Sequence, residues 1–269
     1  MMAARTSAVS APLALCCLVL AAAILAPLAI PVAVSISDSL FVSFPPKGFT
    51  LRWYAQVMAD RDFRSTFLFS VQLALLVTGL SVALGVPCAV GLTRFDFPGR
   101  QVVLGLILSP IVFPVLVTGV ALLQLSSRMG VNDSFLQLLV GHTVICLPYL
   151  VRTVSGALHL VVPSSEDAAR TLGAGPLTTF RRITLPQIRG GILAGCIFAF
   201  ITSFDDYAMA MWLADARHFT LPLQIHVFIE RSFDPSVAAI SALMILFSLA
   251  LLLLVERILG LNMQRIVAG

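Results

Sequence analysis

The stretch Phe67–Leu92 reads FLFSVQLALLVTGLSVALGVPCAVGL and contains no charged residue. A helix needs about 20 predominantly apolar residues to cross about 30 Å of hydrocarbon. The stretch does not alternate polar and apolar residues, as the strands of a membrane β-barrel do. It is therefore predicted to be a membrane-spanning helix, and the chain is predicted to be an all-α membrane protein.

Five further stretches meet the same criterion, at 13–34, 102–124, 135–158, 190–212 and 237–255. The composition agrees, because 59% of the 269 residues are hydrophobic and 11% are charged, against about 45–50% and about 25% in soluble domains. An ordinary soluble enzyme and a disordered chain are excluded. We predict six transmembrane helices in a single membrane domain over residues 1–269. The first stretch is longer than the core of a signal peptide and is expected to remain as an anchor.

The basic residues predict the orientation of these helices. With the N-terminus in the cytoplasm, ten of the 17 Lys and Arg residues, Arg5 and Arg265 among them, fall on the cytoplasmic side. Cytoplasmic loops carry the excess of Lys and Arg in membrane proteins, so both termini are predicted to be cytoplasmic. The chain has no run of five basic residues, which argues against nucleic-acid binding.

The connection at 159–189 is far longer than two neighbouring spans require. Its residues 163–176 read PSSEDAARTLGAGP. This pattern predicts a short helix with Ser164 or Ser165 as the N-cap and Gly173 as the C-terminal stop.

A second short helix is predicted to follow, over Leu177–Thr184, with Pro186 ending it because proline interrupts helical hydrogen bonding. In the first helix, Ala168 and Ala169 leave a flat face. A capped helix with small residues on one face suits docking against another protein.

The same loop carries a family pattern. It reads Asp167-Ala168-Ala169, three residues, Gly173, nine residues and then Ile183-Thr184-Leu185-Pro186. This resembles the EAA loop of ABC-transporter inner-membrane permeases of the binding-protein-dependent type, with Asp167 in place of the usual Glu. The resemblance implies a coupling helix that inserts into a cytoplasmic ATPase through Glu166, Asp167, Ala168, Ala169, Gly173, Ile183, Leu185 and Pro186.

The resemblance also implies the partners and the location. It implies an importer in the bacterial inner membrane, embedded in the lipid bilayer and assembled with an ATPase dimer, a second homologous permease and a periplasmic solute-binding protein. The sequence has no Gly-x-x-x-x-Gly-Lys-[Ser/Thr] loop, so we expect no cofactor in this chain and ATP on the partner. The sequence has no His-Glu-x-x-His either, so neither a metal nor an enzymatic activity is expected.

Two adjacent carboxylates, Asp205 and Asp206, lie within the predicted fifth span. Ionisable groups inside a membrane are costly unless they are paired or hydrated, and they often mark a pathway. One interpretation is an acidic lining for a cation, helped by the rings of Tyr207 and Trp212 through cation–π contacts. The alternative is that the helix ends there and the acids meet water.

The stretch Ser203–Asp206, Leu221-Pro222 and residues 234–241 resemble the permeases of the spermidine/putrescine subfamily. The resemblance implies a polyamine as the solute. Such relatives are expected to carry an acid just after the second proline of the third span, where this chain has Val115. Permeases for opines, aminoethylphosphonate or amino-acid derivatives therefore remain alternatives, as does a secondary transporter or channel.

Overall fold

The computed structural model describes residues 11–231 and 234–259, and every regular element in these ranges is a helix. Arg5 and Arg265, which contribute to the charge count, lie outside the described residues. The elements in chain order are α1 (Ala11–Ser35), α2 (Arg52–Ala59), α3 (Arg61–Arg94), α4 (Arg100–Val112), α5 (Val115–Arg128), α6 (Ser134–Leu160), α7 (Pro163–Thr171), α8 (Pro176–Thr179), the π-helical turn η1 (Phe180–Thr184), α9 (Leu185–Phe204), α10 (Ala210–Leu213), α11 (Leu221–Arg231) and α12 (Ser236–Leu259).

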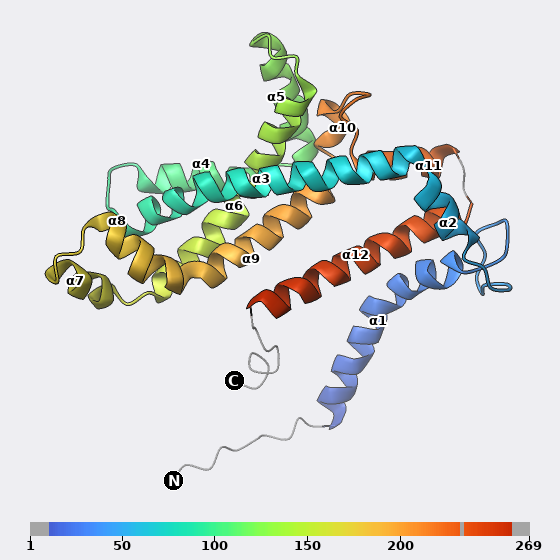
Figure 1. Ribbon diagram of the computed structural model, residues 1–269, viewed down its shortest axis with the longest axis horizontal. Helices are drawn as coiled ribbons and strands as arrows, with labels where there is room; N and C mark the ends of the chain where they lie inside the picture. Colours follow the sequence, from blue (N-terminus) through green and yellow to red (C-terminus); the bar gives the residue numbers. More distant parts are fainter. Residues whose placement is uncertain (1–10, 232–233, 260–269) are drawn as a thin grey trace. The chain divides into compact units, whose positions relative to one another are not determined.

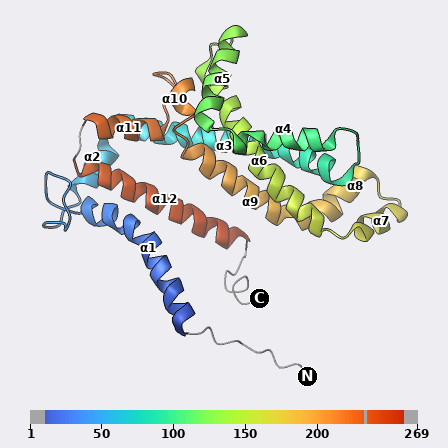
Figure 2. The ribbon, with the colours of Figure 1, turned by 180° about the vertical axis from the view of Figure 1, so that it is seen from behind.

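These helices form two compact units, and the boundary between the units falls inside α11, after His226. The central unit runs from Arg61 to His226, and the terminal unit joins the two ends of the chain. In the central unit, α3, α6 and α9 run side by side (Figures 1 and 2). This three-helix bundle positions both candidate sites, because the loops at its ends carry them.

Glycines let the helices of the bundle approach closely. A Cβ atom built on Gly191 of α9 would lie 2.5 Å from the Cβ of Ala157 and 2.8 Å from the Thr153 carbonyl oxygen, both in α6. One built on Gly85 of α3 would lie 2.6 Å from a methyl carbon of Leu150. Membrane helices commonly associate through such small residues, because lipid provides no hydrophobic force between helices.

Four described helices have the length and apolar composition of membrane spans. Three of them contain the stretches predicted at 13–34, 67–92 and 135–158. The fourth contains the first part of the stretch predicted at 190–212. The stretch predicted at 237–255 lies within the 24-residue helix α12.

The stretch 102–124 is two helices, α4 and α5, bent by 111° at the break between them. A single helix was predicted here. Pro114 explains the difference, because proline disfavours the helical conformation in the residue before it. That residue, Phe113, is extended, with φ −77° and ψ 142°.

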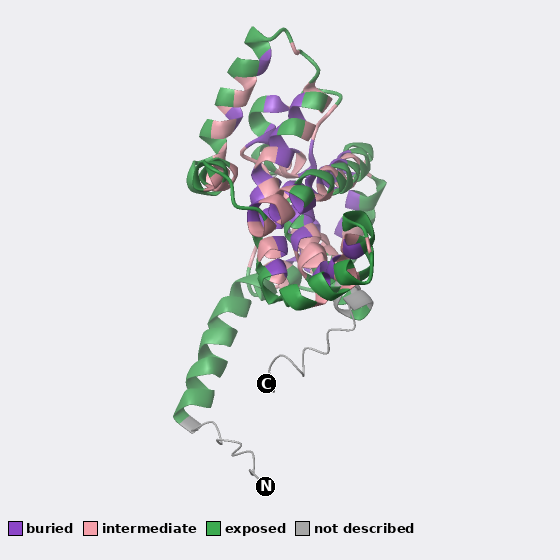
Figure 3. Ribbon diagram, turned by 90° about the vertical axis from the view of Figure 1, so that its left-hand side faces the viewer, coloured by how far each residue is buried: buried purple, intermediate pink, exposed green. Residues whose placement is uncertain are grey.

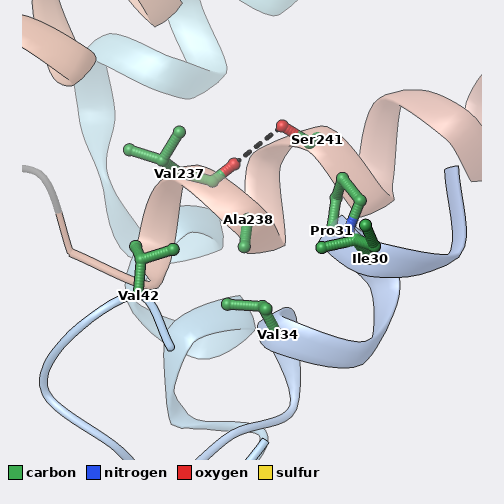
Figure 4. Close-up of a pocket in the computed structure, with 7 residues that line it drawn as sticks. All are labelled: Ile30, Pro31, Val34, Val42, Val237, Ala238 and Ser241. Carbon is green, nitrogen blue, oxygen red and sulfur yellow. Dashed lines mark hydrogen bonds between the residues drawn. The ribbon is translucent and has the colours of Figure 1, made fainter. Parts of the chain in front are cut away.

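In the terminal unit, α2 is fastened to the end of α1. The indole N–H of Trp53 donates to the carbonyl of Ser37 over 2.9 Å, and the hydroxyls of Tyr54 and Ser35 lie 2.6 Å apart. An apolar pocket between α1, α12 and the loop after α1 is lined by Ile30, Pro31, Val34, Val42, Val237, Ala238 and Ser241 (Figure 4). The rest of α1 is exposed along most of its length (Figure 3), as suits a helix solvated by lipid.

Neighbouring glycines test the close packing of the bundle. We expect Gly191→Ala to lower the thermal unfolding midpoint of the purified protein, at a cost of about 1–3 kcal/mol, because the contacts at that position include backbone that cannot move aside. Gly190→Ala is the matched control, because a Cβ there meets nothing within 4 Å. It should be neutral or stabilising by up to about 1 kcal/mol. Equal midpoints for the two variants would contradict the packing.

Candidate functional site

The helix α7 forms as predicted at its C-terminus but not at its N-terminus. Gly173 has φ +84°, and the N–H groups of Gly173 and Ala174 bond to the carbonyls of Arg170 and Ala169, which is a Schellman motif. The predicted serine cap is wrong. The N-cap is Val162, with Pro163 as the first helical residue, and the Ser165 hydroxyl donates to the Val162 carbonyl.

The prediction that Pro186 ends the second helix is also wrong. Residues 176–204 form one long helical segment that runs from α8 through η1 into α9. Proline has no N–H and its ring crowds the preceding turn. Here that turn widens to π-helical geometry, and the Leu185 N–H bonds to the Phe180 carbonyl. The segment outside the bundle therefore continues into the membrane helix without a break.

The predicted coupling residues lie in different environments. Asp167, Ala168, Gly173 and Pro186 are exposed, and Ala169 and Ile183 are partly exposed. Leu185 packs against the core shared by α3, α6 and α9. Two further apolar residues of the loop are exposed to solvent, Leu172 by 89% and Leu177 by 68%. The loop between α6 and α9 thus presents small and apolar residues outward, as a docking surface does.

Glu166 differs from its neighbours in α7 because it is buried. Its Oε1 accepts a hydrogen bond from the Thr184 hydroxyl over 2.7 Å and lies 3.2 Å from Nη2 of Arg94, the last residue of α3. Sequence reasoning missed Arg94 and Thr184. The only signal was that Arg94 is the first charge after the uncharged stretch 67–92.

The two adjacent carboxylates, Asp205 and Asp206, also lie in different environments. The helix α9 ends at Phe204, short of the predicted 190–212, and Asp205 is its exposed C-cap. The side chain of Asp206 is 8% exposed and accepts hydrogen bonds from the backbone N–H groups of Met209 and Ala210, at 2.9 and 3.1 Å. This carboxylate satisfies the first free donors of α10, which explains why the chain turns here.

The buried side of this turn includes His142, a residue for which the sequence suggests no partner. Its Nδ1 lies 2.9 Å from the Ser203 hydroxyl, and its Nε2 lies 3.7 Å from the Asp206 carboxylate. His142 is fully buried. The three side chains connect α6, the end of α9 and the start of α10, so the position of the turn is set by the bundle.

The two aromatic residues predicted beside the acids are only partly exposed. The Tyr207 ring meets the ring of His226 edge-on at 5.1 Å. Trp212 is 38% exposed and packs near Gly119 of α5, where an added Cβ would be 3.2 Å from the indole. The described residues contain no group of three His, Cys, Asp or Glu side chains placed to hold a metal ion.

A second turn follows α10 and is held by Asp215. The backbone N–H of His218, followed by that of Arg217, holds the pKa of the Asp215 carboxyl below its usual value. The His218 ring lies 5.6 Å from Phe69 and 5.8 Å from Phe135, in α3 and α6. This turn is therefore also attached to the bundle, and Asp215 stays ionised near neutral pH.

Several long apolar helices joined by an exposed loop between α6 and α9 define a multi-pass membrane protein. Residues 81–267 match the family model described as "Binding-protein-dependent transport system inner membrane component". The chain belongs to this family and is a multi-pass permease of an ABC importer.

Three similar proteins differ in the solute that their names or descriptions give. The chain is 31% identical to the spermidine/putrescine transport system permease protein PotC of Haemophilus influenzae, over 79% of this chain and 82% of that protein. It is also 31% identical to the molybdenum transport system permease protein ModB of Mycobacterium tuberculosis, over 82% and 90%. A crystal structure of a bacterial ABC transporter involved in alginate import shares the fold, with TM-score 0.68, 19% identity and coverage of 93% and 94%.

The acidic turn makes a stability prediction. Asp206→Ala should lower the thermal unfolding midpoint, at a cost of about 1 kcal/mol or more, because it removes the acceptor for two backbone donors. Asp205→Ala is the matched control, since within the described part of the chain its exposed carboxylate makes no hydrogen bond or ion pair. If the control destabilises as much as Asp206→Ala, the assignment of the cap is wrong.

Proposed function

We propose that this permease imports a small polycation of the polyamine class, delivered by a periplasmic binding protein. The observation that carries the solute class is the exposed carboxylate of Asp205 at the end of α9, in a chain similar to a spermidine/putrescine permease. Tyr207 and Trp212 on the same connection offer partly exposed rings to a cation. In this proposal Asp205 contacts the solute and Asp206 holds the turn that presents it.

The loop at 159–189 is proposed to be the coupling element. The exposed Ala168, Leu172, Gly173 and Leu177 fit a groove on the ATPase, because small and apolar groups allow close approach. ATP then binds the partner and not this chain. The proposal includes six spans with both termini in the cytoplasm, the bent pair α4–α5 counting as one span and α12 as the last. It includes a second permease copy or homologue beside this one.

An oxyanion is the second candidate solute. The similarity to the molybdenum permease is equal in identity to the similarity to PotC and covers slightly more of this chain. An anion would be repelled by an exposed Asp205, which is why the polyamine is placed first.

Uptake by reconstituted proteoliposomes tests the solute class. The assembly would contain this permease, its co-purified partners and the binding protein, with labelled putrescine, spermidine or molybdate outside and ATP supplied to the ATPase side. We expect ATP-dependent polyamine uptake, reduced about tenfold in Asp205→Asn through loss of one charge contact. Molybdate uptake with no polyamine uptake would overturn the polyamine proposal and support the second candidate.

Two glycines with nearly equal φ angles test the coupling loop. Gly173 and Gly99 have φ +84° and +85°, and an added Cβ meets nothing at either position. Aspartate therefore meets a similar unfavourable φ, and adds the same charge, at both positions. Gly173→Asp should reduce uptake by about tenfold or more by blocking ATPase contact, while Gly99→Asp should stay within about twofold of wild type. Equal uptake by both variants, at matched amounts in the membrane, would contradict the coupling role.

A further inference from the structure

Glu166 is the one acidic residue of α7 that faces inward. Its side chain is 9% exposed, whereas that of its neighbour Asp167 is 68% exposed and pairs with Arg170 on the surface of the same helix. Adjacent residues on a helix point about 100° apart. Asp167 is therefore accessible to a partner protein, whereas Glu166 points into the permease.

The buried carboxylate joins three elements at one oxygen. Oε1 of Glu166 lies 3.2 Å from Nη2 of Arg94 at the end of α3, and it accepts a hydrogen bond from the hydroxyl of Thr184 at the end of η1. Thr184 itself is buried, and Arg94 is mostly buried. Among the described residues, this cluster is a polar connection from α7 to both α3 and η1.

The attachment has a mechanical consequence. Thr184 immediately precedes α9, and Arg94 is the last residue of α3. The cluster therefore links α7 to the ends of two helices of the bundle. Hydrogen bonds to an ionised group are stronger than neutral ones, and removing one member leaves a buried charge without its partner.

We propose that Glu166 is a positioning residue. It anchors α7 to α3 through Arg94 and to η1 through Thr184, so that movement of α7 by the ATPase displaces the membrane helices. The resemblance to the EAA loop implied that Glu166 contacts the ATPase, and the proposal assigns it this internal role. It rests on the coupling function proposed for the loop.

Hydrogen exchange of α7 amides in the assembled complex tests the anchor directly. Glu166→Gln and Arg94→Gln should each accelerate exchange about tenfold, as expected when a hydrogen bond to a charged group is lost. The double variant should be less affected than the product of the single effects, because neither charge is then left unpaired. Asp96→Asn is the matched control, since it removes an acid paired with Arg100 at an exposed site and should leave α7 unchanged.

The ratio of solute transported to ATP hydrolysed tests the transmission. In Glu166→Gln hydrolysis should persist while this ratio falls about tenfold, and in Asp96→Asn the ratio should be unchanged. A role in folding alone would lower hydrolysis and uptake together. If Glu166→Gln does not assemble, Thr184→Val is used, which removes only the hydroxyl donor and should accelerate α7 exchange severalfold.

The outcomes separate the two proposals. Wild-type exchange of α7 in Glu166→Gln, or in Thr184→Val where that variant is used, overturns the anchor. The anchor is also overturned if the acceleration of exchange in the double variant equals the product of the accelerations in the two single variants. Accelerated exchange with an unchanged transport ratio overturns the transmission step and leaves the anchor standing, while the coupling function of the loop is decided by the Gly173→Asp and Gly99→Asp pair.

Discussion

The close contact between α6 and α9 at Gly191 is the constraint on which the central unit depends. The hydrophobic effect does not drive membrane helices together, because lipid is as apolar as their side chains. Approach of the two backbones supplies the packing instead, and α3 joins through Gly85. The loop with α7 lies between the end of α6 and the start of α9, and the acidic turn follows α9. The packing of α3, α6 and α9 therefore places the elements to which both candidate sites are attached.

The two sites share a design in which one acid of an adjacent pair is structural and the other is exposed. Glu166 is bound by Arg94 and Thr184, next to an exposed Asp167. Asp206 is bound by backbone donors of α10, next to an exposed Asp205. A buried carboxylate is tolerated only when its acceptors are satisfied. Each buried acid thus fixes the backbone that carries its exposed neighbour.

Sequence reasoning succeeded where a local rule applies. The length of the apolar stretches predicted the helices, and Gly173 stopped α7 because a positive φ favours glycine there. It failed where two rules competed. Pro186 should interrupt a helix, yet a π-helical turn absorbed it. The same class of residue did break the stretch 102–124, at Pro114. Neither result follows from the position of a proline alone. The neighbouring packing decides whether a π-helical turn or a break in the helix costs less free energy.

The sequence by itself determined that this chain is a helical membrane protein, where most of its spans lie and which loop carries the family pattern. These conclusions rest on composition, on the length of apolar stretches and on the spacing of residues within one loop, none of which depends on contacts between distant parts of the chain. Only the tertiary structure decided which acid of each pair is buried, because that depends on Arg94, His142 and Thr184, which are distant in sequence. A carboxylate meets its partner through the packing of α3, α6 and α9, and that packing cannot be read from any one helix.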